Sequence, residues 1–167
     1  MKKNIVPMIL ALALCAPSAF ANPPKIGDYV KYQTTTVHKS GPDDVVTLAY
    51  TLISFDSVKN RFNRSIEGVD LAGSEPGQTL NDQDTYKPAI MPNGGDYVGV
   101  LDGCEKTGGK IVDITAAGQN LKSCYYGPQD SQTWMANVPF GIVKGVTVDS
   151  SNGDVTTQEL IEYRFGQ

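Results

Sequence analysis

The sequence predicts a mainly β protein: a single curved antiparallel sheet, shaped as a half-barrel or open barrel, with little helix and one disulfide. Segments rich in Val, Ile, Tyr and Thr recur along the chain, and turns containing Gly, Asn and Asp separate them. No segment keeps the 3.6-residue apolar period of an amphipathic helix, so a short helix or two is the most we expect.

The first 21 residues have the pattern of a bacterial secretory signal peptide. A basic start at Lys2 and Lys3 precedes the apolar run Ile5–Ala16, and Ala19-Phe20-Ala21 is a small-x-small cleavage site. The apolar run is shorter than the roughly 20 residues that cross a bilayer as a helix. We therefore expect cleavage after Ala21, one β-rich domain over 22–167, no transmembrane segment after cleavage, and a periplasmic or extracellular location.

Three cysteines become two on cleavage. A lipoprotein would carry its lipid on Cys15, but Leu14 stands where such signals need a small residue, so simple secretion is favoured. Cys104 and Cys124 are then the remaining thiols in an oxidising compartment, and we expect them to form a disulfide, with a stabilisation of roughly 3 kcal/mol. A redox pair lacks CxxC spacing, and metal thiolates lack partners in a chain with one histidine.

The net charge argues against two classes of anionic partner. Loss of Lys2 and Lys3 leaves 12 basic residues against 18 acidic ones, a net charge of −6 in place of −4. The basic residues are not clustered, which argues against nucleic acid and against an anionic membrane surface.

The candidate strands follow one another between turn residues. The long apolar segment Val45–Phe55 is expected near the centre of the sheet. The segment 72–95 is dense in Gly, Pro, Asn and Asp, and we expect a partly docked loop there, either a lid or a mobile loop. In chain order the strands are Asp28–Val37, Val45–Phe55, Arg61–Val69, Tyr97–Leu101, Lys110–Thr115, Leu121–Tyr126, Trp134–Asp149 and Val155–Phe165.

Asn152-Gly153 is a strong signal for a two-residue type I′ hairpin turn. That turn pairs Val148 with Thr157, Val146 with Glu159, Ile142 with Tyr163, and Phe140 with Phe165. It places Lys144 and Glu159 as an ion pair at a rim, and Leu160 on the opposite face. The expected apolar face consists of Phe140, Ile142, Val146, Val148, Val155, Ile161, Tyr163 and Phe165.

The cysteines also limit the topology. If 97–104, 110–115 and 121–126 formed a simple meander, Cys104 and Cys124 would lie two strands apart, about 9.6 Å. A disulfide tolerates about 7 Å between Cα atoms. Cys104 should therefore lie in a loop folded over the sheet, or its segment is not the third strand of that meander.

No catalytic or metal motif is present. The sequence contains no GxSxG, HExxH or SxxK, and His38 at a turn is expected to be solvated. The oxygen-rich segments Asp149–Asp154 and Asp82–Asp84 lack the spaced ligands of a calcium loop. Paired carboxylates cannot be chosen without geometry. We expect no cofactor and no enzyme activity.

The aromatic residues leave three alternatives open. After processing, eight tyrosines, Trp134 and four phenylalanines remain. They could form a core, line an apolar groove, or make a platform for glycan or protein contact.

The segments Ile114–Cys124, Val138–Lys144 and Glu159–Tyr163 resemble a group of secreted bacterial proteins. That group shares a "V-P-(apolar)-G-(apolar)-V-K" strand and a closing "E-L-(apolar)-x-(aromatic)" strand. By general shape it resembles the curved half-barrels of the LolA and LppX lipoprotein carriers. The resemblance implies a curved sheet and a lipid-holding concave face. This chain departs from the carriers because it lacks evident helices to cover that face, and it carries over no functional residue.

Together these observations favour a non-enzymatic binding protein of the bacterial envelope. Its concave face, lined by Phe140, Ile142, Tyr163 and Phe165, would hold an apolar small molecule, a lipid or a lipidated protein in a cavity of a few hundred Å³. The alternative is an interaction or structural protein of the envelope that acts through an exposed β surface. A hydrolase is the least favoured class.

We predict that the exported protein begins at Asn22, because cleavage follows the small-x-small site. N-terminal sequencing of protein from the periplasm or medium would show this directly. A mature chain that retains residues 1–21 would contradict the assignment.

Overall fold

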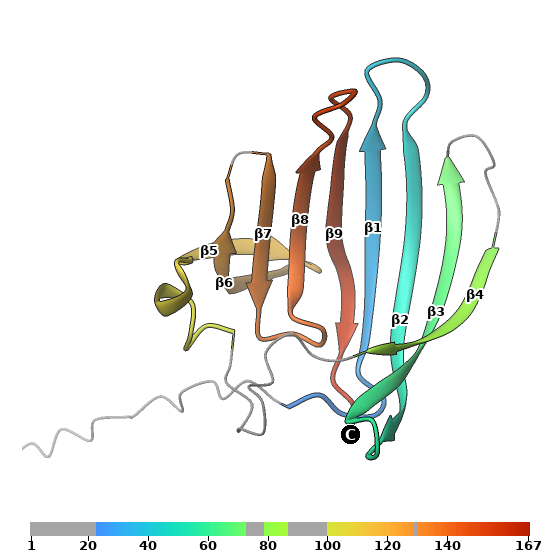
Figure 1. Cartoon of the computed structure of the whole chain (residues 1–167), viewed down its shortest axis with the longest axis vertical. Helices are drawn as coiled ribbons and strands as arrows, with labels where there is room; N and C mark the ends of the chain where they lie inside the picture. The colour runs from blue at the N-terminus through green and yellow to red at the C-terminus, as the bar shows by residue number, and fades with distance from the viewer. Residues whose placement is uncertain (1–22, 73–78, 87–99, 129) are drawn as a thin grey trace, which may run out of the picture.

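The computed structural model describes residues 23–72, 79–86, 100–128 and 130–167. These residues form one nine-stranded antiparallel sheet in the order β4-β3-β2-β1-β9-β8-β7-β6-β5 (Figure 1). The fold class predicted from the sequence is confirmed. The strands are β1 Tyr29–Val37, β2 Asp44–Asp56, β3 Arg61–Ala72, β4 Thr79–Tyr86, β5 Lys110–Ala116, β6 Gln119–Tyr126, β7 Ser131–Ala136, β8 Ile142–Val148 and β9 Val155–Arg164.

The sheet is open and curved, and its edges are β4 and β5. Strands β1, β2, β8 and β9 run side by side, whereas the β5–β6 hairpin crosses their direction (Figure 1). The hairpin turn reaches β9, where the Ala117 N–H donates to the Leu160 carbonyl at 3.1 Å. The Leu160 carbonyl can accept this bond because the pairing of β8 with β9 ends at Glu159, one residue before Leu160. Within the described residues helix is limited to the 3-10 turn η1, Glu105–Thr107, and no helix there has the length and hydropathy to cross a bilayer.

The predictions for the segments 72–95 and 97–101 are corrected. The segment expected as a loop over 72–95 contains β4, whose sequence is polar because an edge strand with one partner needs no apolar alternation. Its other parts, 73–78 and 87–95, lie outside the described residues. The strand expected over Tyr97–Leu101 is wrong at Val100 and Leu101, which lie in turns, and 97–99 are not described.

The single strand expected over Trp134–Asp149 is two strands, β7 and β8. Pro139 has no N–H to donate to a ladder, so the chain turns here. The turn is closed by the Ala136 N–H, which donates to the Gly141 carbonyl at 2.8 Å, and by the Gly141 N–H, which donates to the Val138 carbonyl at 3.0 Å. We call residues 137–141 the β7–β8 turn.

The C-terminal hairpin has a different register from the predicted one. Asn152-Gly153 lies in the turn, but the loop spans Asp149–Asp154, whose ends are joined by a hydrogen bond of 2.9 Å from the Asp149 N–H to the Asp154 carbonyl. The two-residue turn and its pairing are therefore wrong by two residues. Because the shift is even, side chains stay on the faces that the predicted register gave them near the turn. The observed pairs are Val148 with Val155, Val146 with Thr157, and Lys144 with Glu159.

A β-bulge in β9 reverses the predicted faces farther along. The register with β1 shifts between Lys31 and Tyr32, so that Ile161 is an extra residue. Leu160 therefore pairs with Tyr32 and Tyr163 with Val30, which puts Leu160 and Tyr163 on the same face. Leu160 is 2% exposed and belongs to the core, while Ile161 is 42% exposed. The sequence pattern placed Ile161 with Tyr163 and put Leu160 on the opposite face, because a bulge leaves no mark in an alternating pattern.

Two buried clusters form the interior. The larger lies between the middle strands and the β5–β6 hairpin, and comprises Val30, Tyr32, Ala116, Ala136, Val138, Val143 and Leu160. The smaller contains Val100, Cys104 and Cys124. Each cluster buries apolar side chains from segments far apart in sequence, which is the main favourable term holding such a sheet in shape.

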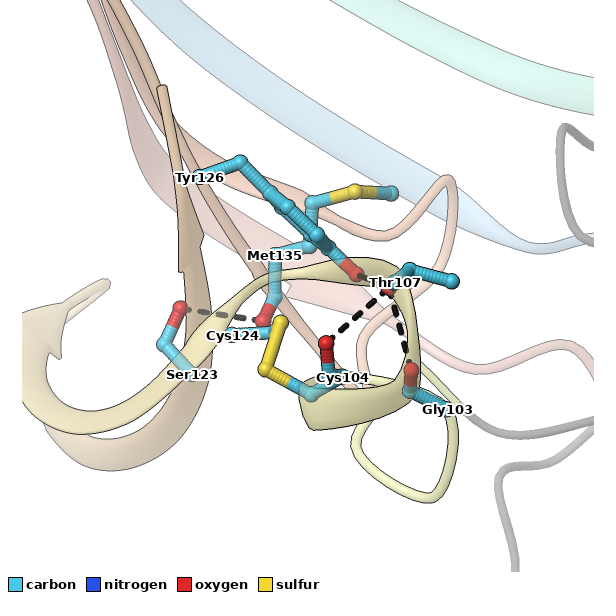
Figure 2. Close-up of a disulfide and its surroundings, with 7 residues drawn as sticks. All are labelled: Gly103, Cys104, Thr107, Ser123, Cys124, Tyr126 and Met135. Carbon is cyan, nitrogen blue, oxygen red and sulfur yellow. Dashed lines mark hydrogen bonds between the residues drawn. A yellow bond between two sulfur atoms is a disulfide. The ribbon is translucent and has the colours of Figure 1, made fainter. Parts of the chain in front are cut away.

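The disulfide between Cys104 and Cys124 is confirmed, with 5.6 Å between the Cα atoms. Cys104 lies in the loop that contains η1, which was one of the two predicted alternatives, and Cys124 lies on β6 (Figure 2). The hydroxyl of Thr107 lies 2.7 Å from that of Tyr126, which holds the loop against β6. Both sulfur-bearing residues are fully buried, which fits a structural bond.

Gly109 offers a test of this packing. An added Cβ would overlap the Sγ atoms of Cys104 and Cys124, whereas one at Gly103 would meet nothing within 4 Å. We predict that Gly109→Ala lowers the free energy of unfolding by about 1–3 kcal/mol relative to Gly103→Ala, through overpacking or failure of the disulfide. Urea unfolding with thiol titration measures this. Equal stabilities with intact disulfides would contradict the packing described.

Candidate functional site

Side chains from six strands and from the β7–β8 turn meet in a pocket of about 180 Å³ on one face of the sheet. We call it the tyrosine pocket. The strand register brings these side chains together. Tyr50 pairs with Val30, and Tyr32 lies two residues after Val30 on the same face of β1, so Tyr32 and Tyr50 are diagonal neighbours. Arg64 pairs directly with Asp84. The lining residues are Tyr32, Tyr50, Arg64, Tyr86, Phe140, Ile142 and Gln158.

Aromatic rings form the walls of the tyrosine pocket. The ring centroid of Phe140 lies 4.8 Å from that of Tyr86 and 6.1 Å from that of Tyr50. Tyr50 also meets Tyr32 edge-on at 6.0 Å. Tilted and edge-on contacts at these distances are favourable for aromatic pairs. Phe140 thus joins rings from β2 and β4, although it lies in the β7–β8 turn.

The backbone at Phe140 is strained. Its φ of 62° is in the left-handed region, which bulky residues avoid at a cost of roughly 1–2 kcal/mol. Gly141, with φ of 81°, follows it and completes the turn without such a cost. A residue held in this conformation is retained where surrounding contacts determine it, and such residues gather at ligand sites. Here the contacts are the rings of Tyr50 and Tyr86.

Tyr32 fixes the position of this turn. Its side chain is 4% exposed, and its hydroxyl donates to the carbonyl of Ile142 at 3.0 Å. Burial raises the pKa of the Tyr32 hydroxyl, with further contributions from Tyr86 and Tyr50. The hydroxyl therefore stays protonated and keeps donating to the first residue of β8.

Arg64 is the charged group of the tyrosine pocket. Its Nε and Nη2 donate to the two carboxylate oxygens of Asp84 at 2.5 and 2.6 Å. Its guanidinium carbon lies 4.7 Å from the ring centroid of Tyr50 and 5.5 Å from that of Tyr86. The hydrogen bonds to Asp84 raise the pKa of Arg64, and the same bonds lower the pKa of Asp84. Both groups are therefore charged at neutral pH.

Two other hollows are less suited to an apolar ligand. One of about 430 Å³ lies along β3 and β4 and is lined by Ser65, Ile66, Glu67, Asp82 and Gln83, mostly polar side chains. The other, of about 240 Å³, lies between the β5–β6 turn and strands β8 and β9, and has the charged groups Lys144 and Glu159 among its lining. These two residues form the predicted ion pair, 2.7 Å between Nζ and Oε1.

Of the four residues expected to form one apolar face, Phe140, Ile142 and Tyr163 pack against the larger buried cluster. Phe140 and Ile142 also line the tyrosine pocket. The hydroxyl of Tyr163 donates to the Gln119 side chain at 2.9 Å. Phe165 is 42% exposed and lies 5.9 Å from Tyr163, centroid to centroid. The last two are not among the residues that line the pocket.

Sequence reasoning did not single out Tyr32, Tyr50, Arg64 or Tyr86. The tyrosines in the first two predicted strands could have indicated an aromatic site, because Tyr32 and Tyr50 lie on the same face of neighbouring strands. Tyr86 was hidden in a segment expected to be a loop. Nothing in the sequence marked Arg64, since its importance depends on pairing with β4.

His38 is more enclosed than expected. Its side chain is 27% exposed, with Nδ1 2.6 Å from Asp154 Oδ2 and Nε2 3.0 Å from Asp44 Oδ2. A neutral imidazole has one N–H, so only the charged ring donates to both carboxylates. Hydrogen bonds to Asp44 and Asp154 raise the pKa of His38. The cluster joins the end of β1 to the two loops at that end of the sheet.

Among the described residues no group of three or more His, Cys, Asp or Glu side chains is arranged to hold a metal ion. In the segment Asp149–Asp154, Asp149 Oδ1 accepts hydrogen bonds from Ser151 N and Oγ at 2.8 and 2.7 Å. That carboxylate therefore stabilises the turn.

Comparisons with known proteins give shape likenesses. No protein-family model matches the chain, and no curated protein matches its sequence. The chain is similar to a protein from Bacteroides fragilis described as exported with a YmcC-like fold, at 11% identity and TM-score 0.47, over 87% of this chain and 99% of that one. Similar structures also include a LolA superfamily protein from Nitrosomonas europaea, at 9% identity and TM-score 0.31, over 88% and 89%.

A third similar structure is MucB in the MucA/MucB complex of Pseudomonas aeruginosa, at 10% identity and TM-score 0.44 over 84% of this chain. This chain spans 52% of that one. The structural neighbours thus include the LolA-type proteins that the sequence resemblance named. The function of this chain has to be argued from its own residues.

We predict that His38→Gln removes one pH-dependent part of the stability. The pKa of His38 is raised above its ordinary 6.5, so its contribution is complete below about pH 6.5 and lost as pH rises through the raised value. The pKa of Asp154 is lowered below its ordinary 3.8, chiefly by His38, so that contribution is lost as pH falls through the lowered value. The wild type should exceed His38→Gln most between about pH 4 and 6.5.

Urea unfolding of both proteins across pH 4 to 9 measures the difference. Lys122→Gln is a suitable control, because it removes an ion pair with Asp113 in which both side chains are 68% exposed. Parallel pH profiles for the wild type and His38→Gln would contradict the charged cluster.

Proposed function

We propose that this chain is an exported, non-enzymatic binding protein that holds an apolar group in the tyrosine pocket. One observation carries the proposal: four aromatic residues and Ile142 line a hollow of about 180 Å³, and one of the four, Phe140, lies in a strained turn. Pockets lined by aromatic and aliphatic side chains with few polar groups are typical of small-molecule sites.

The size of the pocket limits what it takes. Sites for whole drug-sized ligands have volumes of roughly 300–1,000 Å³, and this pocket has about 180 Å³. It therefore suits a single ring or a short alkyl segment, with the rest of a larger ligand outside. A lipid, or the acyl chain of a lipidated protein, would enter by one end.

The export of the chain is inferred from its N-terminal sequence and its disulfide, independently of the pocket. The signal pattern over 1–21 directs the chain out of the cytoplasm. The buried Cys104–Cys124 disulfide is the kind of bond that persists in an oxidising compartment. We place the protein in the periplasm or outside the cell.

The arrangement of titratable groups favours binding over catalysis. His38 is engaged by two carboxylates, and Arg64 by Asp84 and two tyrosine rings. A general base needs a free acceptor within reach of a substrate proton. A charged His38 has no such acceptor to offer.

A pocket-filling variant tests the proposal. The ring signals of Phe140, Tyr50 and Tyr86 should shift in NMR spectra when 1-octanol is added to the wild type. Ile142→Trp should abolish these shifts by occupying the pocket, whereas Ile111→Trp on the exposed side of β5 should leave them unchanged. Absence of shifts in the wild type, or identical shifts in Ile142→Trp, would contradict the proposal.

The second candidate is an envelope interaction protein that acts through a sheet edge. The observation in its favour is β5, a terminal strand of the sheet that carries Ile111 with 40% exposure. Unpaired strand edges bind other chains readily. Native mass spectrometry of protein purified from its own host separates the candidates: a co-purified small amphiphile supports the pocket, and a stoichiometric protein supports the edge.

A further inference from the structure

We propose that the tyrosine pocket recognises an amphiphile with a carboxylate group, and that this carboxylate replaces Asp84 on Arg64. The inference rests on the proposed binding function and specifies the chemical class of its ligand. Asp84 then acts as an internal substitute for the ligand's anionic group.

The first step is the position of the charge. Among the described lining residues of the tyrosine pocket, Arg64 is the charged side chain, and the others are aromatic, aliphatic or amide groups. Its guanidinium lies against the rings of Tyr50 and Tyr86. A ligand whose apolar part lies among these rings therefore has its polar end within reach of one fixed cation.

The second step is the geometry of that cation. Arg64 presents Nε and Nη2 side by side to two oxygens of a single carboxylate. This paired arrangement matches a carboxylate better than it matches a hydroxyl or an amide, and a planar guanidinium fixed between rings loses little freedom on binding. The structure thus already contains the recognition geometry, with Asp84 in it.

Third, the position of Arg64 excludes cationic ligands. Rings such as those of Tyr50, Tyr86 and Phe140 would otherwise attract a quaternary ammonium group. Arg64 already lies against two of these rings, and its positive charge would repel a second cation. The ligand is therefore expected to be an anion, because Arg64 already occupies the ring faces of Tyr50 and Tyr86 that would bind a cation.

The fourth step is that Asp84 can be exchanged. Its side chain is 39% exposed, compared with 23% for Arg64, so it returns to water more readily than its partner. It lies on β4, which has one hydrogen-bonded neighbour, β3. Replacement of one carboxylate by another leaves the charge of the pair unchanged, so the buried apolar part of the ligand supplies the net affinity.

Three probes of equal chain length test the inference at neutral pH: octanoate, 1-octanol and octyltrimethylammonium. For the wild type we expect octanoate and 1-octanol to bind with similar affinity, because the exchange of one carboxylate for another on Arg64 adds no bond, and octyltrimethylammonium to bind least. Asp84→Asn should strengthen octanoate binding by about tenfold, because the Asp84 carboxylate no longer competes with octanoate for the charge-assisted hydrogen bonds of Arg64. It should leave 1-octanol binding unchanged. Asp113→Asn, which also removes one exposed carboxylate, is the matched control.

Arg64→Gln should lower octanoate affinity by about tenfold or more while retaining 1-octanol. Arg64→Lys, which keeps the charge without the fork, should be intermediate and serves if Arg64→Gln does not fold. Unchanged or weaker octanoate binding in Asp84→Asn would overturn the inference, as would equal octanoate binding in wild type and Arg64→Gln. In either case binding of 1-octanol would leave the proposed function intact. If no probe binds the wild type, the proposed function fails first and the inference with it.

Discussion

The hydrogen bond from the Tyr32 hydroxyl to the Ile142 carbonyl is the constraint on which the pocket depends. A hydroxyl as buried as that of Tyr32 must find a partner, because an unsatisfied polar group in the interior costs roughly 1–3 kcal/mol. The partner it finds is the first residue of β8, which fixes where the β7–β8 turn ends. Phe140 is then carried onto the rings of Tyr50 and Tyr86, and these contacts hold its unfavourable backbone conformation.

The same sheet has two regions with different roles. On the β5–β9 side, the disulfide and the bond between Ala117 and Leu160 hold the crossing hairpin against the sheet and bury the larger cluster. On the β1–β4 side, the face is covered by single rings and by the Arg64–Asp84 pair. A well-packed region thus supports a less densely covered one, which is the usual arrangement for a binding surface on a rigid scaffold.

The sequence predicted the fold class, the disulfide and six strands because these depend on local alternation and on compartment. It did not predict the features that depend on the pairing of one strand with another. The sequence of β4 has no apolar alternation, and only its partner β3 makes it a strand. The bulge at Ile161 is an insertion relative to β1, invisible in β9 alone. The pocket was half found: Phe140 and Ile142 follow from the apolar pattern, whereas Arg64 depends on a pairing with Asp84 that no single segment encodes.

If the tyrosine pocket is a binding site, the space between Tyr50, Tyr86 and Phe140 is occupied by another molecule in the cell. A high-resolution crystal structure of the protein isolated from the organism that makes it would show the occupant. We expect non-protein density between the three rings, with a polar end at the guanidinium of Arg64. A structure in which Phe140 moves to fill that space, with the Arg64–Asp84 pair enclosed beneath it, would rule out a binding role for the pocket.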